Sequence, residues 1–226
     1  MPDRSGDGAR LADQAAQLGV ALDRRQAERL LEFARLVAKW NRVFNLIGRG
    51  DVERLLPRHV LDSLSVAPWL VGRQVLDVGT GAGFPGIPLA IAREDAHFTL
   101  VDTHERKIRF IRQTVRSLDL DNVTPCRSDV AALDPSVRFD SVVSRALADP
   151  GRLWELVRDR LRPGGRLVAM TRARIAESDT EAPAGPALPD DAELERRCTV
   201  RIPGLAERHE LLLVRHRDSA ATRSRA

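Results

Sequence analysis

Cysteine and long apolar runs are scarce in this sequence of 226 residues, and each scarcity excludes a class of protein. The two cysteines, Cys126 and Cys198, stand far apart with no Cys-x-x-Cys motif and no Cys/His cluster, so we expect neither a disulfide framework nor a metal site. No apolar run approaches the ~20 residues that span a bilayer, and the first residues lack the apolar core of a secretion signal. We therefore expect a cytoplasmic protein with no membrane partner and no metal.

Lysine is also scarce, since it occurs only as Lys39 and Lys107, and arginine supplies the rest of the 36 basic residues. Against 32 acidic residues the net charge is +4, an excess too small to indicate nucleic acid by itself. Coding bias in a GC-rich genome is the simpler explanation of the arginine. A polyanionic partner stays open, because the planar guanidinium binds phosphate through two hydrogen bonds.

The N-terminal third of the chain has helical periodicity. We expect residues 1–10 to be disordered and residues 11–72 to form a helical region. Asp23 followed by Gln26 resembles a capping box at a helix start. Within the second helical stretch, Pro57 favours a position near a helix start and Pro68 a bend near the end.

Apolar segments of strand character alternate with helical patterns over residues 73–216. This alternation predicts an α/β domain, a Rossmann-like, mostly parallel seven-stranded sheet with helices on both faces. No strong helix separates the last two strands, so we expect a hairpin with an antiparallel strand at the edge. Residues 176–192 predict a mobile loop or a frayed helix start, and residues 217–226 a disordered basic tail. The expected strands are 75–78, 98–102, 123–127, 141–144, 167–171, 198–202 and 210–215, with helices over 86–93, 104–118, 129–134 and 149–161.

A glycine-rich turn, DVGTGAGFPG over residues 77–86, follows the first expected strand. Such a turn at the carboxyl edge of a parallel sheet binds ligands but is weak evidence alone. Asp77 would repel the phosphates of a dinucleotide, whereas it suits S-adenosylmethionine, which carries an ammonium and a sulfonium and no phosphate. Asp102, at the end of the next strand, is placed to accept the ribose hydroxyls of an adenosine, as NAD sites also do.

Together with the Pro163-Gly164-Gly165 turn before the fifth strand, these features look like a class I methyltransferase and predict S-adenosylmethionine as cofactor. Asp129 would face the adenine edge or cap the next helix, and the two roles can coexist. Arg145, at the carboxyl end of the fourth strand, faces the ligand crevice. The cofactor contacts expected from these arguments are Asp77, Gly79, Thr80, Gly81, Gly83, Phe84, Asp102, Asp129 and Arg145.

The segment after the fourth strand, residues 144–150, says something about the methyl acceptor. It lacks the Asn/Asp-Pro-Pro-Tyr/Phe loop that handles exocyclic amines, and no cysteine stands where a carbon acceptor would need one. Guanine N7 has a free lone pair and needs no general base, so this absence weakly favours a ring nitrogen. We therefore expect no catalytic acid or base.

Several motifs carry a family resemblance over residues 11–216. They are KWNRVFNL at 39–46, RHVLDSL at 58–64, residues 77–88, HFTLVD at 97–102 with KIRF at 107–110, FDSVVSRA at 139–146 and VRIPGL at 200–205. In these motifs the chain resembles the bacterial small-subunit rRNA guanine-N7 methyltransferases, the RsmG or GidB family.

The resemblance implies methylation of N7 of a guanine in the decoding-region loop of 16S rRNA, within the small ribosomal subunit or an assembly intermediate. It implies cofactor contacts at Gly79, Phe84 and Arg145 and through the backbone of Val130 and Ala131. Two departures stand out. Thr171-Arg172 replaces a Lys-Gly pair common in relatives, and Ala131 replaces a carboxylate. We expect a monomer.

Under this interpretation Asn45, His59, Asp62 and Ser63 line the acceptor side, and Asn45, His59 and Arg145 position the base. The expected rRNA contacts are Arg106, Lys107, Arg109 and Arg172. The alternatives are a structural histidine at 59 and a solvated face for the basic helix. Other functions stay open: a methyltransferase of the same fold acting on another RNA, a metabolite or a protein, a non-catalytic RNA-binding module, or an NAD-dependent oxidoreductase, which Asp77 disfavours.

Overall fold

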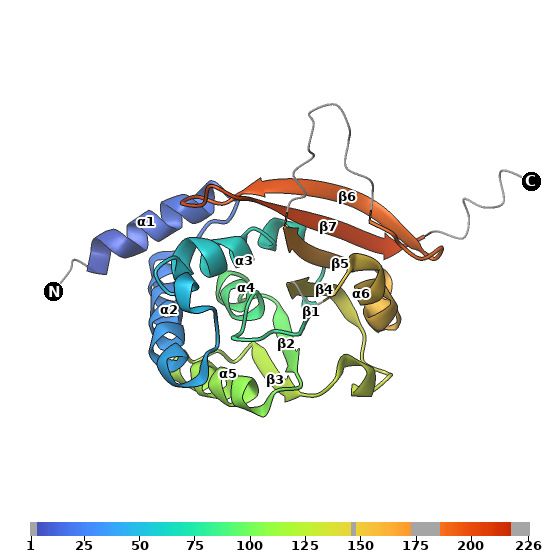
Figure 1. Cartoon of the computed structure of the whole chain (residues 1–226), viewed down its shortest axis with the longest axis horizontal. Helices are drawn as coiled ribbons and strands as arrows, with labels where there is room; N and C mark the ends of the chain where they lie inside the picture. Colours follow the sequence, from blue (N-terminus) through green and yellow to red (C-terminus); the bar gives the residue numbers. More distant parts are fainter. Residues whose placement is uncertain (1–3, 146–147, 173–185, 218–226) are drawn as a thin grey trace, which may run out of the picture.

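The computed structural model describes residues 4–145, 148–172 and 186–217. In this part of the chain seven strands form one sheet in the order β3-β2-β1-β4-β5-β7-β6 (Figure 1). Strands β1 to β5 are parallel, β7 is antiparallel to β5, and β6 is antiparallel to β7. This confirms the predicted fold class, including the hairpin at the edge. The bounds are β1 Gln74–Val78, β2 His97–Asp102, β3 Val123–Arg127, β4 Phe139–Arg145, β5 Leu161–Arg172, β6 Ala192–Arg201 and β7 Arg208–His216.

Helices cover both faces of the sheet, as the alternation of strand side chains requires. Val75 and Val143 belong to one buried cluster, whereas their neighbours Leu76 and Val142 belong to another. The first cluster is covered by α4 (Gly86–Ala92), α5 (Glu105–Ser117) and the N-terminal helices, and the second by α6 (Pro150–Val157) (Figure 1). The 3-10 turn η5 (Arg158–Arg160) follows α6 and leads into β5. After β3 the expected helix over 129–134 is a single 3-10 turn, η4 (Val130–Ala132).

The N-terminal region begins with α1 (Arg4–Ala16) and α2 (Arg24–Phe44). The expectation of disorder over residues 1–10 is wrong for residues 4–10, because α1 buries Leu11 and Ala15 in the first cluster; residues 1–3 lie outside the described part. The second helical stretch is divided into η1 (Arg49–Asp51), the π-helix η2 (Leu56–Leu61), α3 (Asp62–Leu64) and η3 (Ala67–Trp69). Pro57 stands in the first turn of η2, as predicted.

Two other expectations fall largely outside the described residues. Of the loop over 176–192, the structure describes only 186–192, and β6 already begins at Ala192. Of the tail over 217–226 it describes only Arg217. Among the described helices, none is long and apolar enough to cross a membrane.

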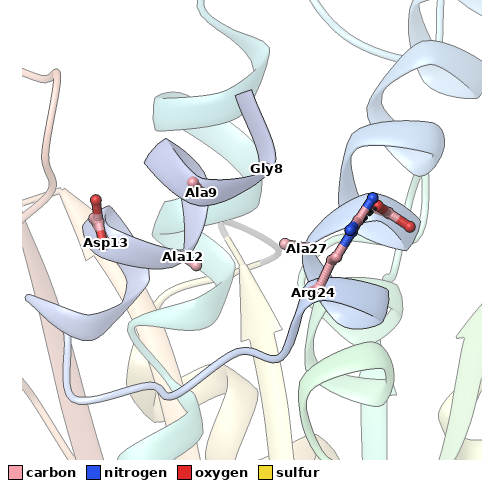
Figure 2. A pocket seen from close by; sticks show the side chains of 7 residues that line it. Gly8, Ala9, Ala12, Asp13, Arg24 and Ala27 are labelled. Atoms are coloured by element: carbon pink, nitrogen blue, oxygen red, sulfur yellow. Dashed lines mark hydrogen bonds and ion pairs between the residues drawn. The ribbon is translucent and has the colours of Figure 1, made fainter. Parts of the chain in front are cut away.

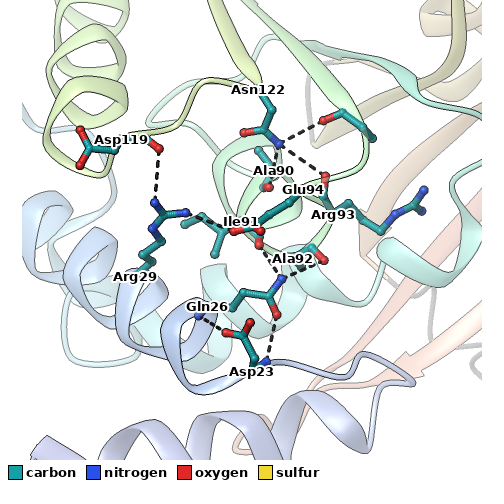
Figure 3. A network of polar contacts seen from close by, with 11 residues as sticks. Asp23, Gln26, Arg29, Ala90, Ile91, Ala92, Arg93, Glu94, Asp119 and Asn122 are labelled. Carbon is teal, nitrogen blue, oxygen red and sulfur yellow. Dashed lines mark hydrogen bonds and ion pairs between the residues drawn. The ribbon is translucent and has the colours of Figure 1, made fainter.

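A polar network fixes the start of α2 against the end of α4 and the turn before β3 (Figure 3). The predicted capping box is present, since Asp23 accepts the Gln26 N–H and the Gln26 side chain accepts the Asp23 N–H. Gln26 also donates to the Ile91 carbonyl (3.1 Å), and Asn122 donates to the Ala90 carbonyl (3.0 Å). Side chains of α2 and of the turn before β3 thus satisfy the carbonyls that α4 leaves unpaired at its end. The N-terminal helices therefore share one core with the sheet.

Candidate cofactor and acceptor site

The glycine turn leaves its backbone open to a ligand. Gly79, Gly81 and Gly83 have φ angles of 70°, 61° and 88°, a region that favours glycine. A Cβ on Gly81 would meet only the Gly79 carbonyl, at 3.9 Å, so the space above it is free. A Cβ on Gly83 would lie 2.7 Å from the Ile87 side chain, so this glycine serves close packing. The N–H groups of Gly79 and Thr80 donate to the Val101 carbonyl and tie the turn to β2.

Asp77 lies beneath this turn and is fully buried. Its Oδ2 accepts the N–H of Gly86 at 2.8 Å, which fixes the start of α4. Its Oδ1 and the hydroxyl of Thr80 are buried and find no hydrogen-bond partner among the described residues. Burial raises the pKa of Asp77 to about 7. The carboxyl group therefore shapes the turn from below.

Asp102 stands at the rim of the same turn. Its Oδ2 accepts the Gly81 N–H at 3.0 Å and lies 3.3 Å from Lys107 Nζ. Its Oδ1 accepts the His104 N–H and lies 2.9 Å from His104 Nδ1. Burial acts to raise the pKa of Asp102, but the hydrogen bonds from His104 and Gly81 and the charge of Lys107 prevail and lower it. Asp102 is therefore an ionised acceptor at the carboxyl end of β2, as the sequence predicts.

The loop after β3 is fixed from two sides. Asp129 caps η4, because its Oδ1 accepts the Ala131 N–H at 2.9 Å. Arg160 of η5 donates to the carbonyls of Asp134 (2.9 Å) and Ala131 (3.1 Å), and only 8% of Arg160 is exposed. Val130 is buried and Ala131 is exposed. Sequence analysis missed Arg160, since nothing local shows that its guanidinium reaches this loop.

Four side chains from distant parts of the chain converge beside Phe84 of the glycine turn. The His59 and Phe84 ring centroids are 5.0 Å apart, and the Arg145 guanidinium carbon lies 5.4 Å from the Phe84 centroid. Arg145 Nη1 is 3.7 Å from Asp62 Oδ2, and Asp62 Oδ1 is hydrogen-bonded to His209 Nδ1 on β7. The structure thus brings together His59, Asp62 and Arg145, three of the expected site residues, and adds His209.

The cluster carries little free charge. His59 is 5% exposed, and neither ring nitrogen has a hydrogen-bond partner among the described residues. Burial, with the nearby Arg145 charge, lowers the pKa of His59 to about 3, so its imidazole is neutral. Burial also lowers the pKa of Arg145, against the opposing effect of Asp62 and Asp77. The half-buried cation of Arg145 therefore faces the buried carboxylate of Asp62, with a neutral imidazole beside them.

Sequence comparison identifies the class to which this site belongs. The family described as GidB, rRNA small subunit methyltransferase G, matches residues 26–187. The chain belongs to this family.

Individual relatives agree with this assignment. The ribosomal RNA small subunit methyltransferase G of Escherichia fergusonii is 36% identical over 205 residues, which cover 90% of this chain and 96% of the relative. That of Methylococcus capsulatus is 42% identical over 195 residues, covering 86% and 92%. The solved CcbJ methyltransferase of Streptomyces caelestis shares the fold, with a TM-score of 0.52, 19% identity and coverage of 71% of this chain and 96% of that one.

As a member of the GidB family the chain is a methyltransferase, and S-adenosylmethionine is its methyl donor. The residues present fit this cofactor. The space above Gly81 is open, and Asp102 is an ionised acceptor at the rim of the turn. The predicted enzyme class and cofactor are confirmed.

The remaining predicted residues of this GidB-family chain contribute no side chain to the cluster of His59, Asp62, Arg145 and His209. Asn45 is exposed and ends α2 in a left-handed conformation (φ 47°, ψ 53°). Ser63 is buried and donates to the His59 carbonyl, so its hydroxyl supports the helix. Lys107 points to Asp102, whereas Arg106 and Arg109 are exposed on α5. The side chain of Arg172 lies outside the described residues. His104 could have been found from sequence, because it directly follows the Asp102 turn.

A groove of about 410 Å³ lies apart from this site, between α1 and α2 (Figure 2). Small residues line it on the α1 side, and the ion pair of Arg24 and Glu28 (2.8 Å) closes it on α2. None of its lining residues belongs to the glycine turn or to the Phe84 cluster. They are Gly8, Ala9, Ala12, Asp13, Arg24, Ala27 and Glu28.

Proposed function

We propose that the chain methylates N7 of a guanine in the decoding-region loop of 16S rRNA. Family membership supports a small-subunit rRNA substrate, because the relatives carry that substrate in their names. The observation that carries the choice of N7 is the chemistry of the Phe84 cluster. Guanine N7 presents a free lone pair and gives up no proton before attack. An enzyme that methylates N7 therefore needs no general base to activate the acceptor.

Among the described residues, no group on the acceptor side is both strongly basic and unpaired. The Asp51 carboxylate, 3.6 Å from His59 Nε2, forms an ion pair with Arg58 at 2.7 Å. His59 is too weakly basic, with its pKa lowered to about 3, and Asp62 is taken up by His209 and Arg145. Asp77 is sealed beneath the turn. An amine or hydroxyl acceptor, which has to lose a proton, would find no accessible group to receive it. A ring nitrogen fits this environment better.

When bound, S-adenosylmethionine supplies the electrophilic methyl group. Asp102, with the backbone of Gly79 and Gly81, would hold the adenosine part at the rim. The Phe84 ring and the neutral His59 would exclude water, and Arg145 would orient the acceptor for in-line attack at about 3 Å. We further propose that the enzyme works as a cytoplasmic monomer, without a metal, on the small subunit or an assembly intermediate.

The test is labelling of small ribosomal subunits from cells that lack this methylation. With tritiated S-adenosylmethionine we expect label in 16S rRNA, at a guanine that borohydride reduction and aniline cleave, a reaction specific for 7-methylguanine. Asp102→Ala should lose the label while keeping the fold by circular dichroism. Label in a protein, a metabolite or an exocyclic amine would refute the proposal.

A further inference from the structure

The end of α2 and the start of α5 lie side by side at the carboxyl edge of the sheet. The Trp40 ring of α2 is 5.7 Å from Phe110 of α5 and 5.3 Å from Phe44, between ring centroids. At the opposite ends, Arg29 of α2 donates to the carbonyl of Asp119, beyond α5. The two helices are therefore antiparallel (Figure 1). Since α5 begins just after Asp102, this junction flanks the glycine turn.

Five exposed cations lie on these two helices, near the end of α2 and along α5 from Arg106 to Arg112. Lys39 and Arg42 belong to the last turns of α2, and Arg106, Arg109 and Arg112 to α5. None of the five forms an ion pair or a side-chain hydrogen bond with any described residue. We call these five residues the α2–α5 cationic surface.

Neighbouring carboxylates do not neutralise this surface. Glu32 of α2 is paired with Arg35 (2.9 Å), and Glu105 of α5 with Arg127 (3.1 Å). Lys107 turns inward to Asp102 and so does not belong to the surface. Elsewhere many arginines have carboxylate partners, for example Arg54 with Glu207, Arg93 with Asp95, Arg158 with Asp191 and Arg162 with Asp140.

An apolar side chain lies among these cations. Val43 is 72% exposed, the most exposed large apolar residue of the described chain, and it stands one residue after Arg42 and one before Phe44. Unpaired guanidinium groups with an exposed apolar group suit a ligand that offers phosphates and the apolar face of a sugar or base. They suit a protein partner less well, because that partner would have to carry carboxylates at positions that match these cations.

We propose that the α2–α5 cationic surface binds the phosphate backbone of the RNA next to the target nucleotide, so that the base enters the crevice past Phe44 and the glycine turn. This inference rests on the proposed function, since it takes RNA as the substrate. It differs from the sequence-based expectation in two ways. It adds Lys39 and Arg42 of α2 to the RNA contacts, and it removes Lys107, which belongs to the rim of the cofactor site.

The test compares two double variants with the same change in charge. Arg42→Gln/Arg109→Gln removes two cations of the surface. Arg10→Gln/Arg25→Gln removes two exposed cations, without ion pairs among the described residues, on α1 and at the distant start of α2. Binding to unmethylated 16S rRNA is measured by filter retention over a range of salt, with steady-state methylation of small subunits and calorimetry with S-adenosylmethionine.

For the surface variant we expect the negative slope of log K against log salt to become shallower by about 1.4 to 1.8, that is by about 0.7 to 0.9 for each lost phosphate contact. The KM for small subunits should rise about tenfold, with kcat and the Kd for S-adenosylmethionine unchanged. The control variant should match the wild type.

Three results would overturn the inference while leaving the proposed function intact. They are an unchanged salt slope, an equal loss in the control variant, or, in an added assay with anionic phosphatidylserine vesicles, a loss of vesicle binding in the surface variant without loss of RNA binding. If the wild type itself transferred no methyl group to rRNA, the proposed function would fail first, and the salt slopes alone would then show whether the surface binds RNA at all.

Discussion

Asp77 and Asp102 flank the same glycine turn, yet burial raises the pKa of Asp77 to about 7 while the donors around Asp102 lower its pKa. Asp77 accepts the Gly86 N–H and has only the Thr80 hydroxyl beside it, whereas Asp102 receives the N–H groups of Gly81 and His104 and the ammonium of Lys107. The first carboxylate is sealed away from water and the second reaches the rim.

The same contrast extends to their neighbours. We call His59, Asp62, Asp77 and Arg145 the floor of the site, because they are buried or half-buried and have few hydrogen-bond partners. The rim consists of Asp102, Lys107 and the loop that Arg160 holds. We infer that changes in the floor alter mainly stability, whereas changes in the rim alter mainly affinity for the cofactor.

The largest effect should come from removing the charge of Asp77. Between about pH 4 and 7 the folded chain holds a proton on Asp77 that the unfolded chain has released, so this group lowers stability as pH rises through that window. Asp77→Asn cannot ionise but still accepts the Gly86 N–H. It should be more stable than the wild type at pH 8, by about 1.4 kcal/mol for each unit of displaced pKa.

His59 makes this prediction sharper because its effect has the opposite sign. Its folded pKa of about 3 lies below the ordinary 6.5, so stability rises with pH between these values. In the wild type the two slopes offset each other from about pH 4 to 6.5. Asp77→Asn should expose the rise due to His59 in urea unfolding at pH 5, 6, 7 and 8. Parallel curves for variant and wild type would contradict the assignment of a raised pKa to Asp77.

The second effect concerns the ion pair in the floor. Asp62→Ala removes the acceptor of His209 and leaves Arg145 without its nearest carboxylate. We expect a loss of about 3 kcal/mol in the free energy of unfolding, the low end for a broken buried pair, because 23% of the Arg145 side chain is exposed. Glu155→Ala, which breaks the exposed pair with Arg152, is the control and should cost under about 1 kcal/mol. Equal losses of unfolding free energy in Asp62→Ala and Glu155→Ala would show that Asp62 does not belong to the buried floor.

Local pattern was enough to predict the sheet and the position of Asp102. Apolar strands such as Val75–Val78 and the capping box of Asp23 and Gln26 depend on neighbours in sequence, so they are readable without a structure. The extent of β6 could not be predicted. Its first half carries the charged residues Glu193, Glu195 and Arg196 at the sheet edge and shows no apolar periodicity.

The contacts of the site were harder to predict than its position. Asp62 and His209 are 147 residues apart, and no local signal joins them. The sequence places Lys107 on a basic helix but does not show whether its ammonium group bonds to Asp102 or faces solvent. In the structure it bonds to Asp102. Residues 4–10 were missed for a similar reason, because α1 is stabilised by its packing against α2. Long-range partners decide these features.

The smallest effect should come from the rim loop, through Arg160. Its guanidinium holds two carbonyls of the loop that is expected to contact the adenine, and Arg160→Lys keeps the charge but offers a compact ammonium that cannot match this fork. The loop then has to be ordered when the cofactor binds, and that cost appears in affinity. We expect the Kd and KM for S-adenosylmethionine to rise by up to about tenfold, or about 1.4 kcal/mol. The kcat at saturating cofactor should stay unchanged, which separates positioning from a general loss of structure. Arg162→Lys, which changes the arginine of the ion pair with Asp140, is the control. It should leave the Kd and KM for S-adenosylmethionine and the kcat unchanged. If Arg160→Lys lowered the free energy of unfolding without changing the KM, Arg160 would belong with the floor, and the division between floor and rim would have to be redrawn at η4.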